Sequence, residues 1–207
     1  MSIQAIKKTL SMALLAVICA TAPGMASQVG TNNPAFAPVG GATSIPIGHA
    51  EFCRSHPADC SPNASVVAMV ELTQKLWQQL LNVNASVNAQ IVPETDANLY
   101  HVAEFWTYPH GFGDCEDIAL AKRQKLINAG WPASTLLMSV VRESNGEGHA
   151  VLMVRTDRGD LVLDNQDGMV RVWNDTSYHY VKRQSQADQG AWVDIVDQRA
   201  TVIAAAR

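Results

Sequence analysis

The stretch after Pro132 constrains the fold most, because its residue pattern changes there to the one typical of β-strands. Six short segments are rich in β-branched and apolar residues, and polar turn residues separate them. They are residues 134–143, 149–156, 160–166, 169–175, 178–184 and 191–196. The short "RTDRGDL" connection is typical of a hairpin, so the segments are predicted to form an antiparallel sheet.

Helical patterns precede this sheet. Ser61 is placed to cap a helix whose first residue is Pro62, and apolar residues then recur at helical spacing until about Asn88. A second helix is predicted to begin at Asp114 or Cys115 and to run through "IALAKRQKLINAG". Helices followed by strands indicate an α+β fold, with N-terminal helices packed on a C-terminal antiparallel sheet.

Residues 1–26 have the pattern of a secretory signal peptide, with two lysines, an apolar run and small residues at the exit. The apolar run is short for a transmembrane span. A lipid anchor through Cys19 or a retained membrane helix is the alternative. The pattern predicts export. Residues 27–50 are rich in Gly, Pro and Asn and are predicted to form an extended lead-in with little regular structure. Residues 51–207 are predicted to form one domain.

The charge of the chain argues against nucleic acid as a partner. Without the two lysines of the signal segment, 13 basic and 19 acidic side chains remain, for a formal charge of −6. There is no basic stripe of the kind that binds a phosphate backbone. No later stretch is long and apolar enough to span a bilayer. This composition favours an exported enzyme or binding domain.

Three cysteines remain after the signal segment, an odd number that suggests one pair and one free thiol. Cys53 and Cys60 lie on either side of a Pro-containing turn, and a disulfide between them is reasonable in an oxidising compartment. Cys115 is then the leftover thiol. An exposed free thiol would tend to oxidise there, so Cys115 needs a reason to persist.

Cys115 lies in "GFGDCED", at the predicted start of a helix. Unpaired N–H groups at a helix start favour a thiolate and can supply a backbone donor to an oxyanion. The two glycines permit a sharp turn and the close approach of a substrate. Three neighbouring carboxylates, from Asp114, Glu116 and Asp117, oppose thiolate formation. Taken alone, this cysteine is also compatible with a small core residue.

His149 begins one predicted strand and Asp164 ends the next. A short loop joins these strands, so they are predicted to pair and to bring the two side chains near each other. Asp164 could then orient an imidazole that holds the Cys115 thiolate and later protonates the leaving group. Taken singly, His149 also fits a hydrogen-bonded strand histidine, and Asp164 a strand-end cap. A zinc site at Cys115 and His149 lacks a further close ligand.

The order of these motifs resembles that of the bacterial transglutaminase-like cysteine peptidases, the group that contains the periplasmic LapG-type proteases. The resemblance covers residues 52–195 and is carried by "FC…HP…C", "L-x-x-VN-x-x-VN-x-x-I", "GDCED", "HAVL-x-V", "G-x-L-V-LDN" and "W-V-x-I". It implies a papain-like or transglutaminase-like fold. It also implies Cys115 as nucleophile, His149 as base and acid, and Asp164 as orienting carboxylate.

The resemblance implies further site residues. Trp106 is a candidate second oxyanion donor through its indole N–H, although packing of a buried aromatic also accounts for it. Calcium dependence is implied, with Asp114 and Glu116 as ligands and Asp117 as a third. Helix capping and dipole complementarity account for the same carboxylates without metal. Glu104 stands where the family pattern has Asp, which leaves substrate preference open.

Three functions are compatible with the sequence. The resemblance implies a periplasmic thiol endopeptidase whose protein substrate is a large surface adhesin, cut at a small-residue site, so that its release disperses a biofilm. An inner-membrane c-di-GMP receptor is the implied regulatory partner. The same triad would serve a transglutaminase-like acyltransferase or amidase. A non-catalytic calcium-binding interaction domain is the third alternative.

Overall fold

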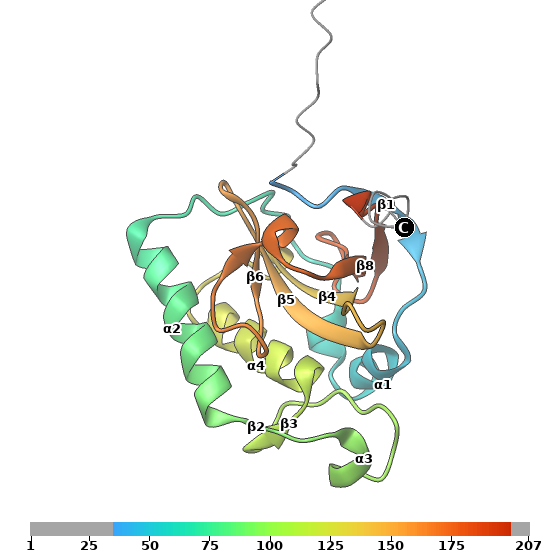
Figure 1. Ribbon diagram of the computed structural model, residues 1–207. Coiled ribbons are helices and arrows are strands. Elements are labelled where there is room, and N and C mark those ends of the chain that lie inside the picture. The colour runs from blue at the N-terminus through green and yellow to red at the C-terminus, as the bar shows by residue number, and fades with distance from the viewer. Residues whose placement is uncertain (1–34, 200–207) are drawn as a thin grey trace, which may run out of the picture. The chain divides into compact units, whose positions relative to one another are not determined.

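A seven-stranded antiparallel sheet forms the centre of the protein (Figure 1). The computed structural model describes residues 35–199, which fall within one compact unit, and the predicted signal peptide lies outside them. The strand order is β1–β9–β8–β4–β5–β6–β7. The strands are β1 (Val39–Thr43), β4 (Leu136–Arg142), β5 (Gly148–Thr156), β6 (Gly159–Leu163), β7 (Arg171–Val172), β8 (His179–Gln184) and β9 (Trp192–Ile195). A separate parallel pair consists of β2 (Val92–Pro93) and β3 (Phe112–Gly113).

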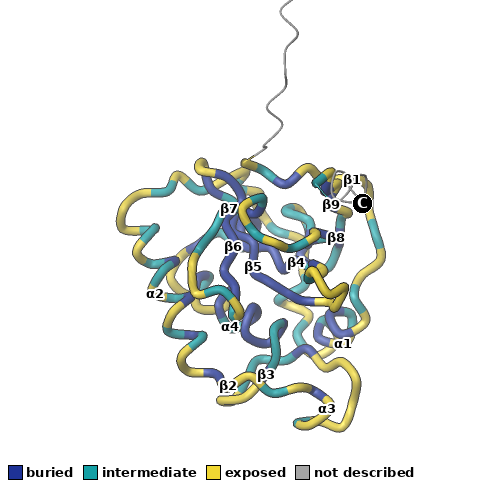
Figure 2. Tube along the Cα trace, in the orientation of Figure 1, coloured by how far each residue is buried: buried dark blue, intermediate teal, exposed yellow. Residues whose placement is uncertain are grey.

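The sheet confirms the strand pattern of the sequence, because each of the six predicted segments overlaps one of its strands. Both faces of the sheet are buried, and the central strands are dark blue in Figure 2. On β5, Leu152 and Val154 enter the larger core, whereas Val151 and Met153 pack near Trp173 in a second core. Successive residues of one strand therefore serve different faces, as the pleat requires.

Helices cover one face of the sheet (Figure 1). They are α1 (Ile47–Ser55), α2 (Gln74–Gln90), α3 (Asp96–Leu99) and α4 (Cys115–Asn128), with 3-10 turns η1 (Pro57–Cys60), η2 (Ala133–Thr135) and η3 (Trp173–Asp175). Helix α4 packs against β4 and β5, and α2 packs against α4. The prediction of an α+β fold is therefore confirmed. Within residues 35–199, no helix has the length and apolarity needed to cross a bilayer.

Helix α4 begins at Cys115, as the sequence predicted. It ends shortly before Gly130, whose φ of +93° lies in the left-handed region that glycine commonly adopts after a helix.

The first long helix starts later than predicted. Helix α2 begins after Thr73, whose side chain accepts a hydrogen bond from the Leu76 N–H, and the predicted start at Ser61 is wrong. The intervening residues bond to distant segments instead. Val70 N, for example, donates to Arg155 O at 3.1 Å. Such long-range bonds satisfy peptide groups that a local helix would otherwise satisfy.

The lead-in contains more regular structure than predicted. Residues 39–43 form β1, which pairs with β9 through partners such as Thr43 and Trp192, and α1 begins at Ile47. The sequence "VGGAT" has no strand periodicity, and β9 supplies the hydrogen-bonding edge that holds it extended.

A disulfide joins Cys53 in α1 to Cys60 in η1, the pairing expected from the cysteine count. The preceding turn of α1 lies against Trp106. A Cβ added at Gly48 would come within 2.3 Å of the Trp106 ring, so glycine permits this close approach. The next residue, His49, is buried between Trp106 and Trp192, with ring centroids 5.3 and 5.4 Å away.

His49 is a buried histidine that is held neutral. The Trp192 indole N–H donates to His49 Nδ1 at 3.1 Å. Burial, with a smaller contribution from the charge of Arg123, lowers the pKa of His49 from 6.5 to about 4.

The lowered pKa of His49 predicts a loss of stability in acid. The unfolded chain binds a proton near pH 6.5 while the folded protein does not, so the stabilisation is present above pH 6.5. It is lost as the pH falls from 6.5 towards 4. In urea unfolding, wild type should lose up to about 1.4 kcal/mol more per pH unit than His49→Gln over this range.

The control for this measurement is His110→Gln, which removes an exposed imidazole. It should keep the wild-type pH dependence. Equal slopes for wild type and His49→Gln would contradict the assignment of His49 as a buried neutral histidine.

Candidate active site

A cleft of about 430 Å³ brings the predicted nucleophile and base to one place. Both Cys115 and His149 line it, on α4 and β5 respectively. Its remaining lining residues are Pro46, Glu104, Trp106, Glu116, Val140, Gly148, Ala150 and Lys182. Residues far apart in the sequence therefore meet because α4 packs on β5.

Cys115 is the first residue of α4, where backbone N–H groups have no partner inside the helix. The backbone N–H of Ala150 donates to Cys115 Sγ at 3.4 Å, which ties the helix start to β5. Gly113 makes the preceding turn possible, because a Cβ there would lie 2.8 Å from Asp117 Oδ2. The motif glycine is thus required by packing against the first turn of α4.

His149 and Asp164 form a buried hydrogen bond of 2.9 Å between Nε2 and Oδ1. The β5–β6 register pairs Leu152 with Leu163, which leaves Asp164 just past the end of β6 and close to His149. The predicted proximity is therefore present. Burial raises the pKa of Asp164, but hydrogen bonds from His149 and Tyr178 outweigh it, so that this pKa lies below its usual range.

The thiol of Cys115 interacts with a carboxylate rather than with the histidine. Its Sγ donates to Glu116 Oε2 at 3.1 Å, and no hydrogen bond within residues 35–199 joins Cys115 to His149. Burial first, and then the charge of Glu116, raise the pKa of the Cys115 thiol far above its usual range. In this arrangement the thiol is protonated.

Trp106 lines the cleft, and its side chain is 4% exposed. Its indole N–H donates to Glu104 Oε1 at 2.6 Å. Glu104, the residue that departs from the family pattern, therefore engages the group that was predicted as a second oxyanion donor. That role of Trp106 stays a prediction.

Three carboxylates converge beside the thiol, and one of them was not predicted. Ligand oxygens of Asp96, Asp114 and Glu116 all lie within 4.8 Å of one another. Asp96 comes from α3, about twenty residues earlier in the chain, and no spacing in the sequence linked it to the motif. Burial, with the charges of Asp114 and Glu104, raises the pKa of Asp96 to about 6.

Two oxygens of this carboxylate cluster (Asp96, Asp114 and Glu116) are buried without a partner. They are Asp96 Oδ1 and Asp114 Oδ1, for which residues 35–199 provide no hydrogen-bond donor. Asp114 occupies the N-cap position of α4 but makes no side-chain capping bond. Capping therefore does not account for Asp114. Buried polar atoms are normally satisfied, so these oxygens point to a missing partner.

Asp117, the third ligand implied by the resemblance, has a hydrogen-bond partner of its own. Its Oδ1 accepts a hydrogen bond from the Thr107 backbone N–H at 2.7 Å, which braces the segment that carries Trp106. It does not belong to the carboxylate cluster. Burial, with added charge from Asp114 and Asp96, raises the pKa of Asp117 to about 8.

The geometry defines a class of protein. A thiol at a helix N-terminus, beside a strand histidine bonded to an aspartate, on helices packed against an antiparallel sheet, is the arrangement of the transglutaminase-like cysteine peptidases. The family described as bacterial transglutaminase-like cysteine proteinase BTLCP matches residues 39–200, and the chain belongs to this family. The protein is therefore a cysteine peptidase, as the sequence resemblance implied.

A solved structure agrees on the fold. Calcium-bound LapG from Legionella pneumophila is 21% identical, with a TM-score of 0.50, and the match covers 64% of this chain and 81% of that chain. EGTA-treated LapG from the same organism is 25% identical, with a TM-score of 0.49, over 59% of this chain and 68% of that chain. Comparison with curated proteins gives no significant match.

The Cys115–Glu116 contact predicts a slow thiol in metal-free protein. With a chelator present at pH 10, above the pKa of about 9 to which burial and the charge of Asp114 raise Glu116, Glu116→Gln should react with iodoacetamide several times faster than wild type. The substitution removes the negative charge that helps to raise the thiol pKa, although burial still opposes ionisation. Labelling is followed by mass spectrometry of the peptide that contains Cys115.

The matched control is Glu51→Gln, which neutralises a surface carboxylate that pairs with Arg54. It should label at the wild-type rate. If Glu116→Gln labels no faster than Glu51→Gln, then Glu116 does not suppress the thiol.

Proposed function

We propose that this cysteine peptidase is an exported endopeptidase that cleaves protein substrates with a Cys115–His149–Asp164 triad. The observation that carries the proposal is the buried 2.9 Å bond from His149 to Asp164 at a cleft that Cys115 also lines. In this class an aspartate holds the imidazole in the tautomer that can accept the nucleophile's proton.

The hydrogen bond assigns roles to the two ring nitrogens. Nε2 of His149 carries its proton towards Asp164, which leaves Nδ1 to accept the proton of the Cys115 thiol. The thiolate then attacks the substrate carbonyl carbon, and the C–N bond breaks as the imidazolium protonates the leaving amine. Water, deprotonated by His149, attacks the carbonyl carbon of the resulting thioester, and the C–S bond breaks as the imidazolium protonates the departing thiolate and the acid is released. The thiol proton thus leaves with the amine, and a proton from water replaces it.

The start of α4 supplies electrostatic support for this chemistry. The backbone N–H groups of its first turn carry partial positive charge and have no helical partner, so they suit a developing oxyanion. The Trp106 indole is the candidate second donor, once it leaves Glu104. Lys182 also lines the cleft and adds positive charge at its rim.

We also propose that Asp96, Asp114 and Glu116 hold a calcium ion. Two oxygens bound to one Ca²⁺ lie at most about 5 Å apart, a limit that the carboxylate cluster satisfies. Two of the oxygens are buried without a partner, and burial raises the pKa of all three groups. A bound cation would neutralise the carboxylates beside the thiol. Calcium is the ion to test first, since LapG was solved in a calcium-bound form.

The wider biology rests on the sequence resemblance. We propose a periplasmic location, a large surface adhesin as the substrate, and an inner-membrane c-di-GMP receptor as the regulator. The signal-peptide pattern over residues 1–26 supports export. The cleft of about 430 Å³ beside Cys115 is where we propose that a segment of the protein substrate binds.

Substitutions in the triad should abolish turnover. Cys115→Ala and His149→Ala should lower kcat by about 10⁴-fold or more, because each removes a group that bonds or moves a proton in every step. Asp164→Asn should have an effect of the same order, since it favours the wrong imidazole tautomer. The measurement is cleavage of a peptide library by mature protein, with new termini read by mass spectrometry.

A parallel reaction with an amine donor separates the alternative chemistries. New peptide termini indicate hydrolysis, whereas a mass gain equal to the amine indicates acyl transfer. His101→Ala, at an exposed loop position, is the control and should retain activity. Full activity of Cys115→Ala would end the proposed mechanism.

Calcium should bind metal-free protein directly. Isothermal titration should show one site, and a calcium concentration of 100 times Kd should stabilise the fold by about 2.7 kcal/mol. Asp96→Asn should weaken binding at least tenfold, because it removes one of the three charged ligands. Asp194→Asn, an exposed carboxylate on β9, is the control. Unchanged affinity in Asp96→Asn would exclude the proposed ligand set.

A further inference from the structure

Asp164 is held by two side chains, only one of which belongs to the proposed triad. Its Oδ1 lies 2.9 Å from His149 Nε2, and its Oδ2 accepts a hydrogen bond of 2.5 Å from the Tyr178 hydroxyl. The backbone N–H of Gln166 also donates to Oδ1 at 3.1 Å. Both carboxylate oxygens are therefore engaged, and the plane of the carboxylate is defined.

Tyr178 contacts the histidine as well. The rings of Tyr178 and His149 lie 5.3 Å apart, with planes inclined at 51°. Burial first, and then the adjacent Asp164 carboxylate, raise the pKa of Tyr178 well above its usual range, so its hydroxyl remains a donor at any working pH. The Tyr178 side chain thus fixes the orientation of Asp164 by a hydrogen bond and limits the rotation of the His149 imidazole by packing.

The position of Tyr178 explains how it reaches these two residues. His149 is the second residue of β5, at the end of the strand that borders the Cys115 cleft. Tyr178 packs on the sheet face opposite α4, against the core that contains Val151 and Met153, and directly precedes β8 (His179–Gln184). The segment between η3 and β8 therefore covers the back of the His149–Asp164 pair.

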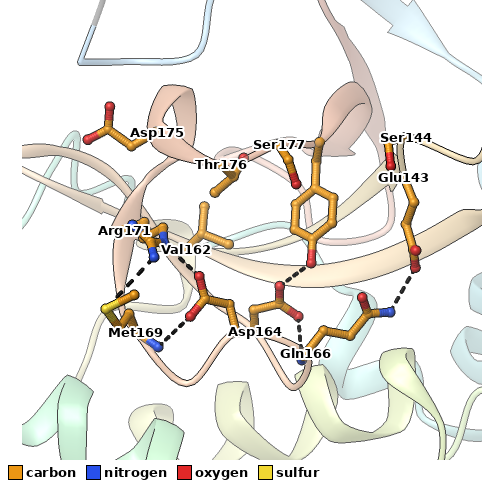
Figure 3. A pocket seen from close by; sticks show the side chains of 12 residues that line it. Glu143, Ser144, Val162, Asp164, Gln166, Met169, Arg171, Asp175, Thr176 and Ser177 are labelled. Carbon is orange, nitrogen blue, oxygen red and sulfur yellow. Dashed lines mark hydrogen bonds and ion pairs between the residues drawn. The ribbon is translucent and has the colours of Figure 1, made fainter.

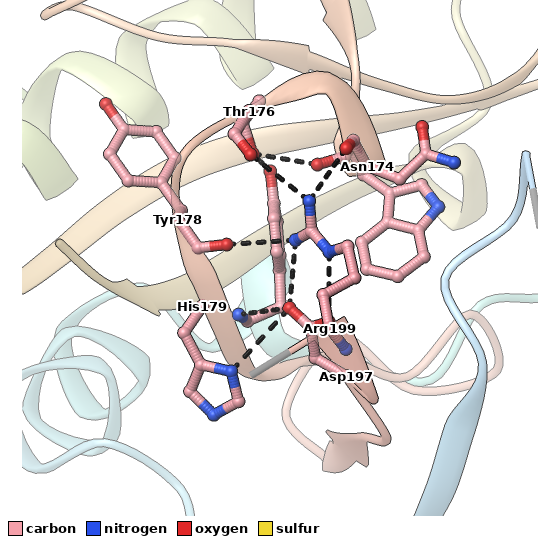
Figure 4. A network of polar contacts seen from close by, with 8 residues as sticks. Asn174, Thr176, Tyr178, His179, Asp197 and Arg199 are labelled. Carbon is pink, nitrogen blue, oxygen red and sulfur yellow. Dashed lines mark hydrogen bonds and ion pairs between the residues drawn. The ribbon is translucent and has the colours of Figure 1, made fainter. Parts of the chain in front are cut away.

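Arg199 holds this segment in place (Figure 4). Its guanidinium donates to the backbone carbonyls of Asn174, Thr176 and Tyr178, at 2.8, 3.1 and 2.9 Å. It also forms a two-point pair with Asp197, at 3.0 and 2.9 Å. A planar fork of five N–H donors can make all of these bonds at once, which a lysine cannot.

Aromatic rings support the guanidinium. Arg199 lies over the Trp173 ring at 4.7 Å and over the Tyr180 ring at 5.8 Å. Both rings are buried in the core of that sheet face. The clamp formed by Arg199 and Asp197 is therefore anchored in the interior rather than on a mobile surface.

We propose that Tyr178 is a positioning residue that orients Asp164 for His149, and that Arg199 holds Tyr178 in place. The proposal rests on the proposed triad and adds a fourth side chain to it, with a clamp from the C-terminal end of the described chain. Neither residue touches the reacting atoms. Both act through the orientation of the aspartate.

A cavity beside the pair explains why the tyrosine matters. A space of about 460 Å³ lies against Asp164 and Tyr178, and most of the side chains that line it are polar (Figure 3). If the Tyr178 hydroxyl were removed, water from this space could reach Asp164 Oδ2. The carboxylate would then be held at one oxygen by the protein and could rotate. Small errors in the placement of catalytic groups are costly, up to about a hundredfold in rate for 1 Å.

Tyr178→Phe tests the proposal, because it removes one hydroxyl and keeps the ring. With the best peptide from the library, kcat should fall about tenfold to a hundredfold and KM should change less than twofold. The proton NMR signal of His149 Nε2–H, shifted downfield by its bond to Asp164, should move or broaden. If the Tyr178 hydroxyl had only a structural role, its removal would neither lower kcat selectively relative to KM nor alter this NMR signal.

Tyr108→Phe is the matched control, because Tyr108 is also a partly buried tyrosine whose hydroxyl faces a carboxylate, that of Asp59. It should keep the wild-type kcat and the His149 signal. Calcium affinity should stay unchanged in both variants, since the carboxylate cluster lies on other elements.

Arg199→Lys tests the clamp and keeps the positive charge. Like Tyr178→Phe, it should lower kcat and leave KM unchanged, because one ammonium group cannot bind three carbonyls and Asp197 together. Adding Tyr178→Phe to Arg199→Lys should cause little further loss, as expected for residues that act through one path. Arg158→Lys, on an exposed turn, is the control. Arg199→Lys also keeps the proposal testable if Tyr178→Phe fails to fold.

The outcomes separate this inference from the proposed function. Full activity of Cys115→Ala would overturn the triad itself. If Cys115→Ala is inactive while Tyr178→Phe keeps wild-type kcat and the His149 signal, the triad stands and the positioning role is overturned. If the two losses in Tyr178→Phe and Arg199→Lys multiply in the double variant, the clamp does not act through Tyr178.

Discussion

The packing of α4 against β5 is the constraint on which the rest of the site depends. It places Cys115, the first residue of the helix, where the N–H of Ala150 reaches its sulfur. His149 precedes Ala150 on the same strand, so one helix-to-strand contact brings the thiol and the imidazole into one cleft. Leu152 and Val154 fill the space beneath the helices, and a close-packed core of this kind resists small shifts of the helix along the sheet.

Carboxyl groups cluster at the start of α4, where their negative charge opposes ionisation of the Cys115 thiol. Asp96, Asp114, Glu116 and Asp117 are all partly or fully buried, and burial raises the pKa of each. Partial positive charge at the helix N-terminus offsets only a fraction of this cost. Under the proposed function, the remainder is offset by a cation, which couples occupancy of the metal site to the state of the neighbouring thiol.

The two faces of the sheet pack against different parts of the chain. One face packs against α4, while the other face packs against the segment that carries Tyr178. Because strand side chains alternate, a single strand can serve a helix on one side and a supporting segment on the other. The His149–Asp164 bond is formed at the neighbouring ends of β5 and β6, where His149 lines the cleft.

The sequence alone determined the features that depend on local spacing. These are the helix start at Cys115, the strand run after Pro132, and the closeness of His149 and Asp164, which follows from one short loop between paired strands. Tertiary structure alone decided which distant groups join them. Asp96, Tyr178 and Arg199 lie on other elements and reach the site through long-range packing, for which no periodicity exists in the chain. The start of α2 after Thr73 has the same cause, because the preceding residues form backbone bonds to remote segments instead of a local helix.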